Sequence, residues 1–259
     1  MKNAKMIGIA GGMGPYASLD LLQKILDHTI ANEDQNHLPV VLISAPDIIS
    51  DRTEFLMGKT SINPAYAISE IISRLIDVGA DVIGIPCNTA HAPPIYNVIV
   101  EVLNGRNKVV KIIHMIDEVV EFMRQNDPIL NNIGILCTTG TSMVKIYPTA
   151  LAEKGYKVIM PDKSIQESTH LAIYNKKYGI KARSNPVTEE AKDHVIRAIN
   201  HLKEKGANAL VLGCSEITFA LREQNIGSIP VIDPVLVLAR ALIRELDPDK
   251  LKPLQGSIL

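Results

Sequence analysis

An internal repeat limits what this chain can fold into more than any other feature of its sequence. Segment 79–90, GADVIGIPCNTA, aligns without gaps with segment 206–217, GANALVLGCSEI, and cysteine falls on cysteine. Cys87 comes 79 residues after Gly8, and Cys214 comes 80 residues after Gly134. Matched motifs at matched spacing indicate two copies of one folding unit. We therefore expect two lobes related by a pseudo-two-fold axis.

Short apolar runs alternate with amphipathic segments along both halves. Runs of this length suit strands buried on both faces of a parallel sheet. They are residues 6–10, 40–44, 82–86, 109–114, 133–136, 157–160, 209–213 and 229–232. Two segments between them have one-sided helical spacing, tightly at Ile68, Ile71, Ile72, Leu75 and Ile76 and more loosely at Leu19, Leu22, Ile25 and Leu26. The predicted fold class is α/β, with two pseudo-symmetric lobes that each hold a parallel sheet flanked by helices.

The same pattern predicts the domain boundaries. Residues 1–116 are expected to form the first lobe and residues 117–224 the second. Residues 225–259 contain a last apolar run and a last amphipathic segment. We expect this segment to return to the first lobe and complete it, because its strand and helix otherwise lack a sheet to join.

Composition and charge exclude several classes of protein. The net charge is −1, and the basic residues are scattered rather than clustered, so no nucleic-acid partner is expected. No window approaches the roughly 18 apolar residues that cross a bilayer. The apolar stretch near Met6 is better explained by a first buried strand than by an export signal. Three widely spaced cysteines do not form a disulfide framework. We expect a cytoplasmic protein with free thiols and no membrane partner.

Cys87 and Cys214 are the candidate catalytic residues. Each directly follows a predicted strand and precedes a helix, at the edge where open α/β sheets bind ligands. Pseudo-symmetry would place the two thiols on opposite sides of a cleft between the lobes. A single cysteine in this position is more often a small core residue. Two at matched positions favour acid/base chemistry whose substrate and product are mirror images, which is racemisation.

The residues after each cysteine suit the same chemistry. A thiol has a pKa of roughly 8.5, which a helix N-terminus lowers, so a thiolate and a thiol can coexist near neutrality. Without a pyridoxal electron sink, the site must stabilise a carbanion-like state with preorganised polar groups. Asn88 and Thr89 follow the first cysteine, and Ser215 and Glu216 follow the second.

Five motifs carry a resemblance to a known family. They are GGMGP at 11–15, DRT at 51–53, PCNTAH at 86–91, TTGT at 138–141 and GCSEI at 213–217. With them the chain resembles the aspartate/glutamate racemase superfamily over nearly its full length, and most closely its aspartate racemase branch. The resemblance implies a cofactor-independent, two-cysteine amino-acid racemase that forms a homodimer. Ser215 stands where the family usually has threonine. The Glu216-Ile217 ending, in place of the His-Tyr of glutamate-specific relatives, argues for aspartate or broad specificity.

The resemblance also implies a substrate pocket. Arg52 would hold the side-chain carboxylate of the substrate, which a guanidinium can grip with two parallel hydrogen bonds. Lys177 would be a second cationic contact, although a solvated surface charge is the alternative. The remaining pocket residues would be Met13, Asn88, Thr89, Thr139, Ser215 and Glu216. Thr138 and Thr141 could belong to the pocket or simply shape their turn.

Other functions are weaker alternatives. The glycine-rich start lacks the dinucleotide-binding pattern, because Ala10 occupies the position of its second glycine. Zinc could in principle bind Cys87, His91, Cys137 and Cys214. The resemblance instead makes His91 an orienting residue, and Cys137 is expected to pack. We expect neither cofactor nor metal. Glutamate or broader specificity remains an alternative, and so does a non-catalytic amino-acid-binding protein.

Overall fold

The computed structural model describes residues 5–105, 110–126, 130–221 and 229–254 and contains two four-stranded parallel sheets. The strand orders are β2-β1-β3-β4 and β6-β5-β7-β8. Each strand of the second sheet therefore has a counterpart in the first, in the same position. The α/β class and the repeat are confirmed. Among the described residues, one compact unit comprises 5–118 with 235–254, and the other comprises 119–234.

The sheet of the first unit is built from the first four predicted runs. Its strands are β1 (Ile7–Gly11), β2 (Val40–Ser44), β3 (Val82–Gly84) and β4 (Lys111–Ile112). β1 is central, with Ile7 opposite both Val40 and Val82. β1 and β3 are fully buried, whereas β2 is half-buried because it forms an edge of the sheet.

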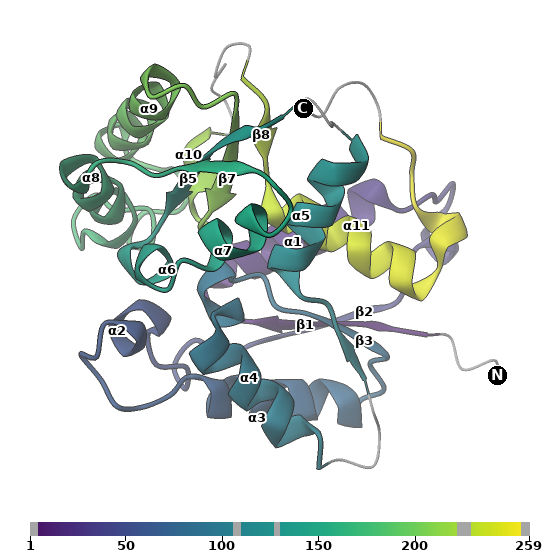
Figure 1. Cartoon of the computed structure of the whole chain (residues 1–259). Helices are drawn as coiled ribbons and strands as arrows, with labels where there is room; N and C mark the ends of the chain where they lie inside the picture. Colours follow the sequence, from purple (N-terminus) through teal and green to yellow (C-terminus); the bar gives the residue numbers. More distant parts are fainter. Residues whose placement is uncertain (1–4, 106–109, 127–129, 222–228, 255–259) are drawn as a thin grey trace. The chain divides into compact units, whose positions relative to one another are not determined.

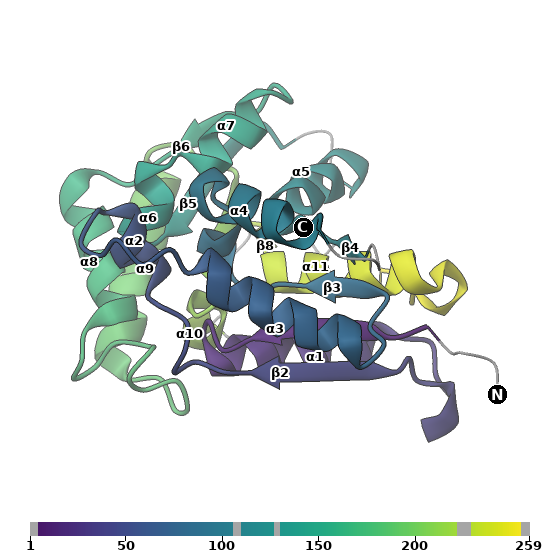
Figure 2. The same ribbon diagram turned by 90° about the horizontal axis from the view of Figure 1, so that it is seen from below.

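Helices cover both faces of this sheet. The apolar face of α3 (Ala65–Asp77) packs with α4 (Pro93–Leu103) on one side. On the other side, α1 (Pro15–His28) packs with α11 (Pro234–Leu246). Figure 1 shows α3 and α4 opposite α11, and in Figure 2, seen from below, α3 lies in front of the sheet. The shorter elements are α2 (Arg52–Leu56), η1 (Asp34–Asn36), η2 (Asn88–His91) and η3 (Pro248–Lys250).

The second unit repeats the plan. Its strands are β5 (Asn132–Cys137), β6 (Lys157–Ile159), β7 (Ala209–Gly213) and β8 (Val231–Ile232). Its longer helices, α8 (Lys163–Tyr174) and α9 (Glu189–Glu204), pack on each other and on β5. α6 (Thr139–Met143), α7 (Ile146–Ala152) and α10 (Ile217–Leu221) are short, and α5 (Met115–Asn126) precedes β5. Within the described part of the chain, no helix is both long and apolar enough to cross a membrane.

The last strand departs from the prediction. β8 pairs with β7, with Val231 opposite Leu210, so it completes the second sheet and not the first. The expectation was wrong because the edge of β7 offers β8 the same position that β4 occupies beside β3. The helix that follows, α11, does pack on the sheet of the first unit. The predicted boundary at residues 224 and 225 lies outside the described residues.

The buried face of α1 also differs from the looser pattern read from the sequence. Leu19 is 54% exposed, whereas Leu21 and Ile25 are fully buried. The small residues Ala17 and Ser18 share the buried face and let the helix approach β1 closely. The predicted stripe therefore shared Ile25 with the buried face but wrongly included Leu19 and missed Leu21.

Candidate active site

The candidate residues of the first unit lie at the carboxyl ends of β1 and β3. The chain leaves β1 for β2 on one side, while β3 lies on the other side, so these two ends form a topological switch point. Open α/β sheets bind ligands at such points. Met13 follows β1 and Cys87 follows β3, and both belong to one buried apolar cluster.

A glycine turn brings the chain from β1 to Met13. Gly12 has a φ of +100°, and a side chain there would place its Cβ 2.9 Å from the backbone nitrogen of Pro46. Only glycine both adopts this positive φ readily and leaves room for the backbone of Pro46. The Ser18 hydroxyl accepts a hydrogen bond from the Gly12 amide at 3.1 Å and donates one to the Gly14 carbonyl at 3.1 Å. The turn is therefore tied to the first turn of α1, which fixes the backbone around Met13.

Arg52 lies on an element that packs against the segment after Cys87. That segment is η2, in which Asn88 and Thr89 are buried. α2 packs against η2 and begins with Arg52, whose side chain is only 7% exposed. The guanidinium donates to the Ser50 carbonyl at 3.2 Å, and Asp51 caps the helix by accepting from the Glu54 amide at 2.9 Å. The structure thus brings a buried cation to the edge that holds Cys87.

His91 is a fully buried neutral side chain four residues after Cys87. Its Nε2 lies 3.1 Å from the Ile85 carbonyl and donates to it. Burial, with a smaller contribution from His114, lowers its pKa to about 3. The ring also packs against Tyr96 and His114, at centroid distances of 5.4 and 4.8 Å. His91 therefore joins the chain on either side of Cys87 as a neutral hydrogen-bond donor.

The candidate residues of the second unit lie at the equivalent carboxyl ends of β5 and β7. Cys214 follows β7 and is 5% exposed, and its Sγ donates to Oε2 of Glu216 at 3.0 Å. The other carboxylate oxygen, Oε1, accepts from Nζ of Lys181 at 2.8 Å. Burial and then the charge of Glu216 raise the pKa of the Cys214 thiol well above its usual value, while Lys181 acts in the opposite direction. Ser215, between them, is buried.

The turn after β5 is shaped by two of its threonines. Thr138 caps α6 by accepting from the Thr141 amide at 3.3 Å, and the two hydroxyls lie 3.1 Å apart. Thr139, the first residue of α6, is half-buried at the same edge of the sheet. Cys137, the last residue of β5, is buried, which raises the pKa of its thiol to about 12. A thiol with that pKa stays protonated, as expected of a packing residue.

Comparison with known proteins identifies the family. The sequence profile of the Asp/Glu/hydantoin racemase family matches residues 10–242. The chain belongs to this family. It is therefore an isomerase of the amino-acid racemase class.

Solved and characterised relatives span nearly the whole racemase. The aspartate racemase of Picrophilus torridus is 29% identical, with 98% of this chain and 97% of that one covered and a TM-score of 0.78. An aspartate racemase homologue from Pyrococcus horikoshii shares the fold at 22% identity, with 94% and 99% covered and a TM-score of 0.67. The broad specificity amino-acid racemase RacX of Bacillus subtilis is 25% identical, with 92% and 96% covered.

The lysine that contacts the racemase's candidate site is one that sequence reasoning missed. Lys177 is exposed on the turn after α8, and its backbone amide donates to Asn175 at 2.8 Å. Lys181, four residues later, is the lysine that pairs with Glu216. Gly179, two residues before Lys181, is a sequence signal for a tight turn here, because a Cβ at this position would lie 2.6 Å from the backbone of Asn175. Such a close approach folds the segment back on itself and redirects the residues after it.

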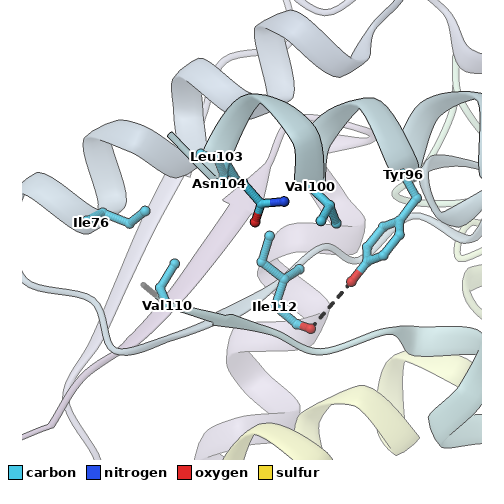
Figure 3. A pocket seen from close by; sticks show the side chains of 7 residues that line it. All are labelled: Ile76, Tyr96, Val100, Leu103, Asn104, Val110 and Ile112. Carbon is cyan, nitrogen blue, oxygen red and sulfur yellow. Dashed lines mark hydrogen bonds between the residues drawn. The ribbon is translucent and has the colours of Figure 1, made fainter. Parts of the chain in front are cut away.

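Two further observations concern possible metal ligands and a hollow away from Cys87. Within the described ranges, no three His, Cys, Asp or Glu side chains gather as metal ligands would. A hollow of about 210 Å³ lies where α3 and α4 end and β4 begins, and Figure 3 shows its seven lining side chains, including Asn104 and Tyr96. It is at the amino-terminal edge of the sheet, opposite the edge that holds Cys87, so it is no part of the candidate site.

Proposed function

We propose that this racemase interconverts L- and D-aspartate by a cofactor-independent, two-base mechanism. One observation carries the proposal: Cys87 and Cys214 follow equivalent strands, β3 and β7, of two sheets with the same strand order. Each cysteine is buried at a carboxyl edge, where parallel sheets bind ligands. Two equivalent thiols suit a reaction whose two directions are mirror images.

In the proposed reaction, one cysteine acts as a thiolate and removes the α-proton of the bound amino acid. The other acts as a thiol and delivers a proton to the opposite face of the same carbon. After one turnover the two protonation states have exchanged, which prepares the enzyme for the reverse direction. The polar residues after each cysteine would stabilise the carbanion-like state, as preorganised dipoles do in other enzymes.

The preference for aspartate rests on charge. Arg52, a buried cation near the segment after Cys87, would bind the side-chain carboxylate of the substrate. Lys177, the second cationic contact expected from the sequence, is exposed on the turn after α8 and is not part of the proposal. The remaining proposed pocket residues are Met13, Asn88, Thr89, Thr139, Ser215 and Glu216. The likeness to the aspartate racemase of Picrophilus torridus supports this choice. The likeness to RacX supports a second candidate, a racemase of broader specificity that includes glutamate.

The two candidates, and the independence from cofactors, are tested together by chiral chromatography. The purified protein is dialysed against a chelator and incubated with the L-enantiomers of aspartate, glutamate and several neutral amino acids. We expect D-aspartate to form fastest, at the same rate before and after dialysis. Faster racemisation of a neutral amino acid would favour the broad-specificity candidate, and a rate that returned only with zinc would refute the cofactor-free mechanism. We also expect a cytoplasmic homodimer.

A further inference from the structure

Two oppositely charged side chains form a chain of contacts that ends on the sulfur of Cys214. Lys181 donates to one oxygen of Glu216 at 2.8 Å, and the other oxygen accepts the thiol of Cys214 at 3.0 Å. The carboxylate is 7% exposed and the lysine side chain 25% exposed. The two charged residues come from different segments, 35 positions apart. The fold, and not local sequence, brings them together.

We infer that Glu216, held by Lys181, is a positioning residue that keeps Cys214 in its thiol form and directs its S–H bond. The geometry alone supports this role, since a carboxylate oxygen at 3.0 Å can accept from a thiol but cannot donate to a thiolate unless it is protonated. The inference rests on the proposed function only for its catalytic consequence.

Lys181 determines where the shared proton resides. An ammonium group next to a carboxylate favours the ionised form of that carboxylate. Glu216 therefore remains negative, and the proton between the two groups stays on sulfur. The negative charge then opposes ionisation of the thiol, which together with burial raises the pKa of Cys214. The hydrogen bond from the backbone N–H of Glu216 acts in the opposite direction.

Among the described residues of this unit, Glu216 and Lys181 are the charged groups that act on the Cys214 thiol. Tyr147, on α7, is fully buried, and burial raises the pKa of its phenol well above the usual value. Cys137, Asp233 and Cys214 also raise the pKa of Tyr147, by smaller amounts. Tyr147 and Cys137 are thus neutral near pH 7 and add no charge beside the Cys214 thiol.

The consequence for the reaction is that Cys214 is the acid of the resting enzyme. The form with Cys214 protonated would then be more abundant than the form in which it is the base. L- and D-amino acids have equal free energies, so kcat/KM in the two directions must remain equal whatever Glu216 does. The effect is therefore visible in the ionisation of the thiol itself and not in the ratio of the two rates.

The test is the pH dependence of alkylation of Cys214 by iodoacetamide, followed by mass spectrometry of its peptide in the full chain. Only the thiolate reacts. Glu216→Gln keeps the shape and removes the charge, so the midpoint should fall by about one pH unit or more, with an about tenfold faster reaction at neutral pH. Glu189→Gln is the matched control, because Glu189 forms an ion pair with Lys192 at 2.9 Å in the same unit. It should leave the midpoint unchanged.

Variants of Lys181 give a second measurement that does not depend on the folding of Glu216→Gln. The comparison is made at the alkaline end of the alkylation profile, where ionisation of the carboxylate no longer depends on its lysine. There, Lys181→Met should slow alkylation, and Lys181→Arg should restore it. An unchanged midpoint in Glu216→Gln, or an equal shift in Glu189→Gln, would overturn the inference. Alkylation needs no turnover, so a shifted midpoint in a protein that racemises nothing would refute the proposed function alone.

Discussion

Arg52 is the residue whose replacement should change substrate choice most. If its buried guanidinium binds the side-chain carboxylate of aspartate, Arg52→Ala should reduce kcat/KM for aspartate by the equivalent of about 2–5 kcal/mol, the usual cost of removing one partner of a buried charge pair. Arg52→Lys, which keeps the charge but loses the two-pronged geometry, should fall in between. Activity on a neutral amino acid should change much less. Aspartate racemisation by Arg52→Ala at the wild-type rate would show that the contact is wrong.

His91 should make stability depend on pH. Its pKa is lowered to about 3 in the folded protein and is near 6.5 in the unfolded chain. Between these values the unfolded chain binds a proton that the folded protein excludes. The free energy of unfolding should therefore fall as the pH drops from about 6.5, by up to about 1.4 kcal/mol per pH unit. Above that pH the residue contributes no slope.

Urea unfolding at several pH values between about 7.5 and 4.5 measures this slope. His91→Gln keeps a donor for the Ile85 carbonyl but removes the titration, so its free energy of unfolding should fall less steeply with acid. Equal slopes in wild type and variant would mean that His91 is not the buried neutral group described above.

The contacts from Lys181 to Glu216 and from Glu216 to Cys214 show why site residues are only partly predictable from sequence. Cys87 and Cys214 could be chosen because the repeat aligns them, and Glu216 because it follows Cys214. Lys181 was missed because its contact with Glu216 depends on the conformation of residues 175–181. Gly179 marks a close backbone approach there but does not indicate which lysine it brings to the site. The family resemblance had indicated Lys177, which is exposed on the turn after α8.

Among the elements, Thr188 offers a direct test of the packing that supports the second sheet. It caps α9, accepting from the Ala191 amide at 3.2 Å, and its hydroxyl donates to the Tyr178 carbonyl at 2.7 Å. Thr188→Ala should lower the free energy of unfolding by about 1–2 kcal/mol, the usual effect of losing an N-cap. Thr188→Ser, which keeps the hydroxyl, is the control and should lose far less. A loss as large in the serine variant would assign the effect to the methyl group.

Among the elements, the sequence predicted the positions of the strands better than it predicted which strands pair with each other. Runs 40–44 and 209–213 match β2 and β7 residue for residue, because strands of a parallel sheet covered by helices need continuous apolar sequence. The last run was found but placed in the wrong sheet. An apolar run indicates that a segment forms a buried strand. It does not indicate which strand it pairs with, as the pairing of β8 with β7 shows.

For the whole molecule, the internal repeat is the feature on which both the fold and the proposed mechanism depend. Two sheets share one strand order, and each has a cysteine after its third strand in sequence order. Family membership gives the class of reaction, amino-acid racemisation. Beyond that class, we propose that both thiols are needed, because each serves one face of the α-carbon.

The most direct test is exchange and inversion of L- and D-aspartate in heavy water by wild type, Cys87→Ala and Cys214→Ala. Proton NMR reports loss of the α-proton signal, and chiral chromatography reports the opposite enantiomer. Cys137→Ala is the matched control, since it removes a buried thiol at the end of β5. We predict that wild type and Cys137→Ala exchange and invert both enantiomers, whereas neither Cys87→Ala nor Cys214→Ala inverts either one. Normal inversion by Cys87→Ala or by Cys214→Ala would contradict the two-base mechanism.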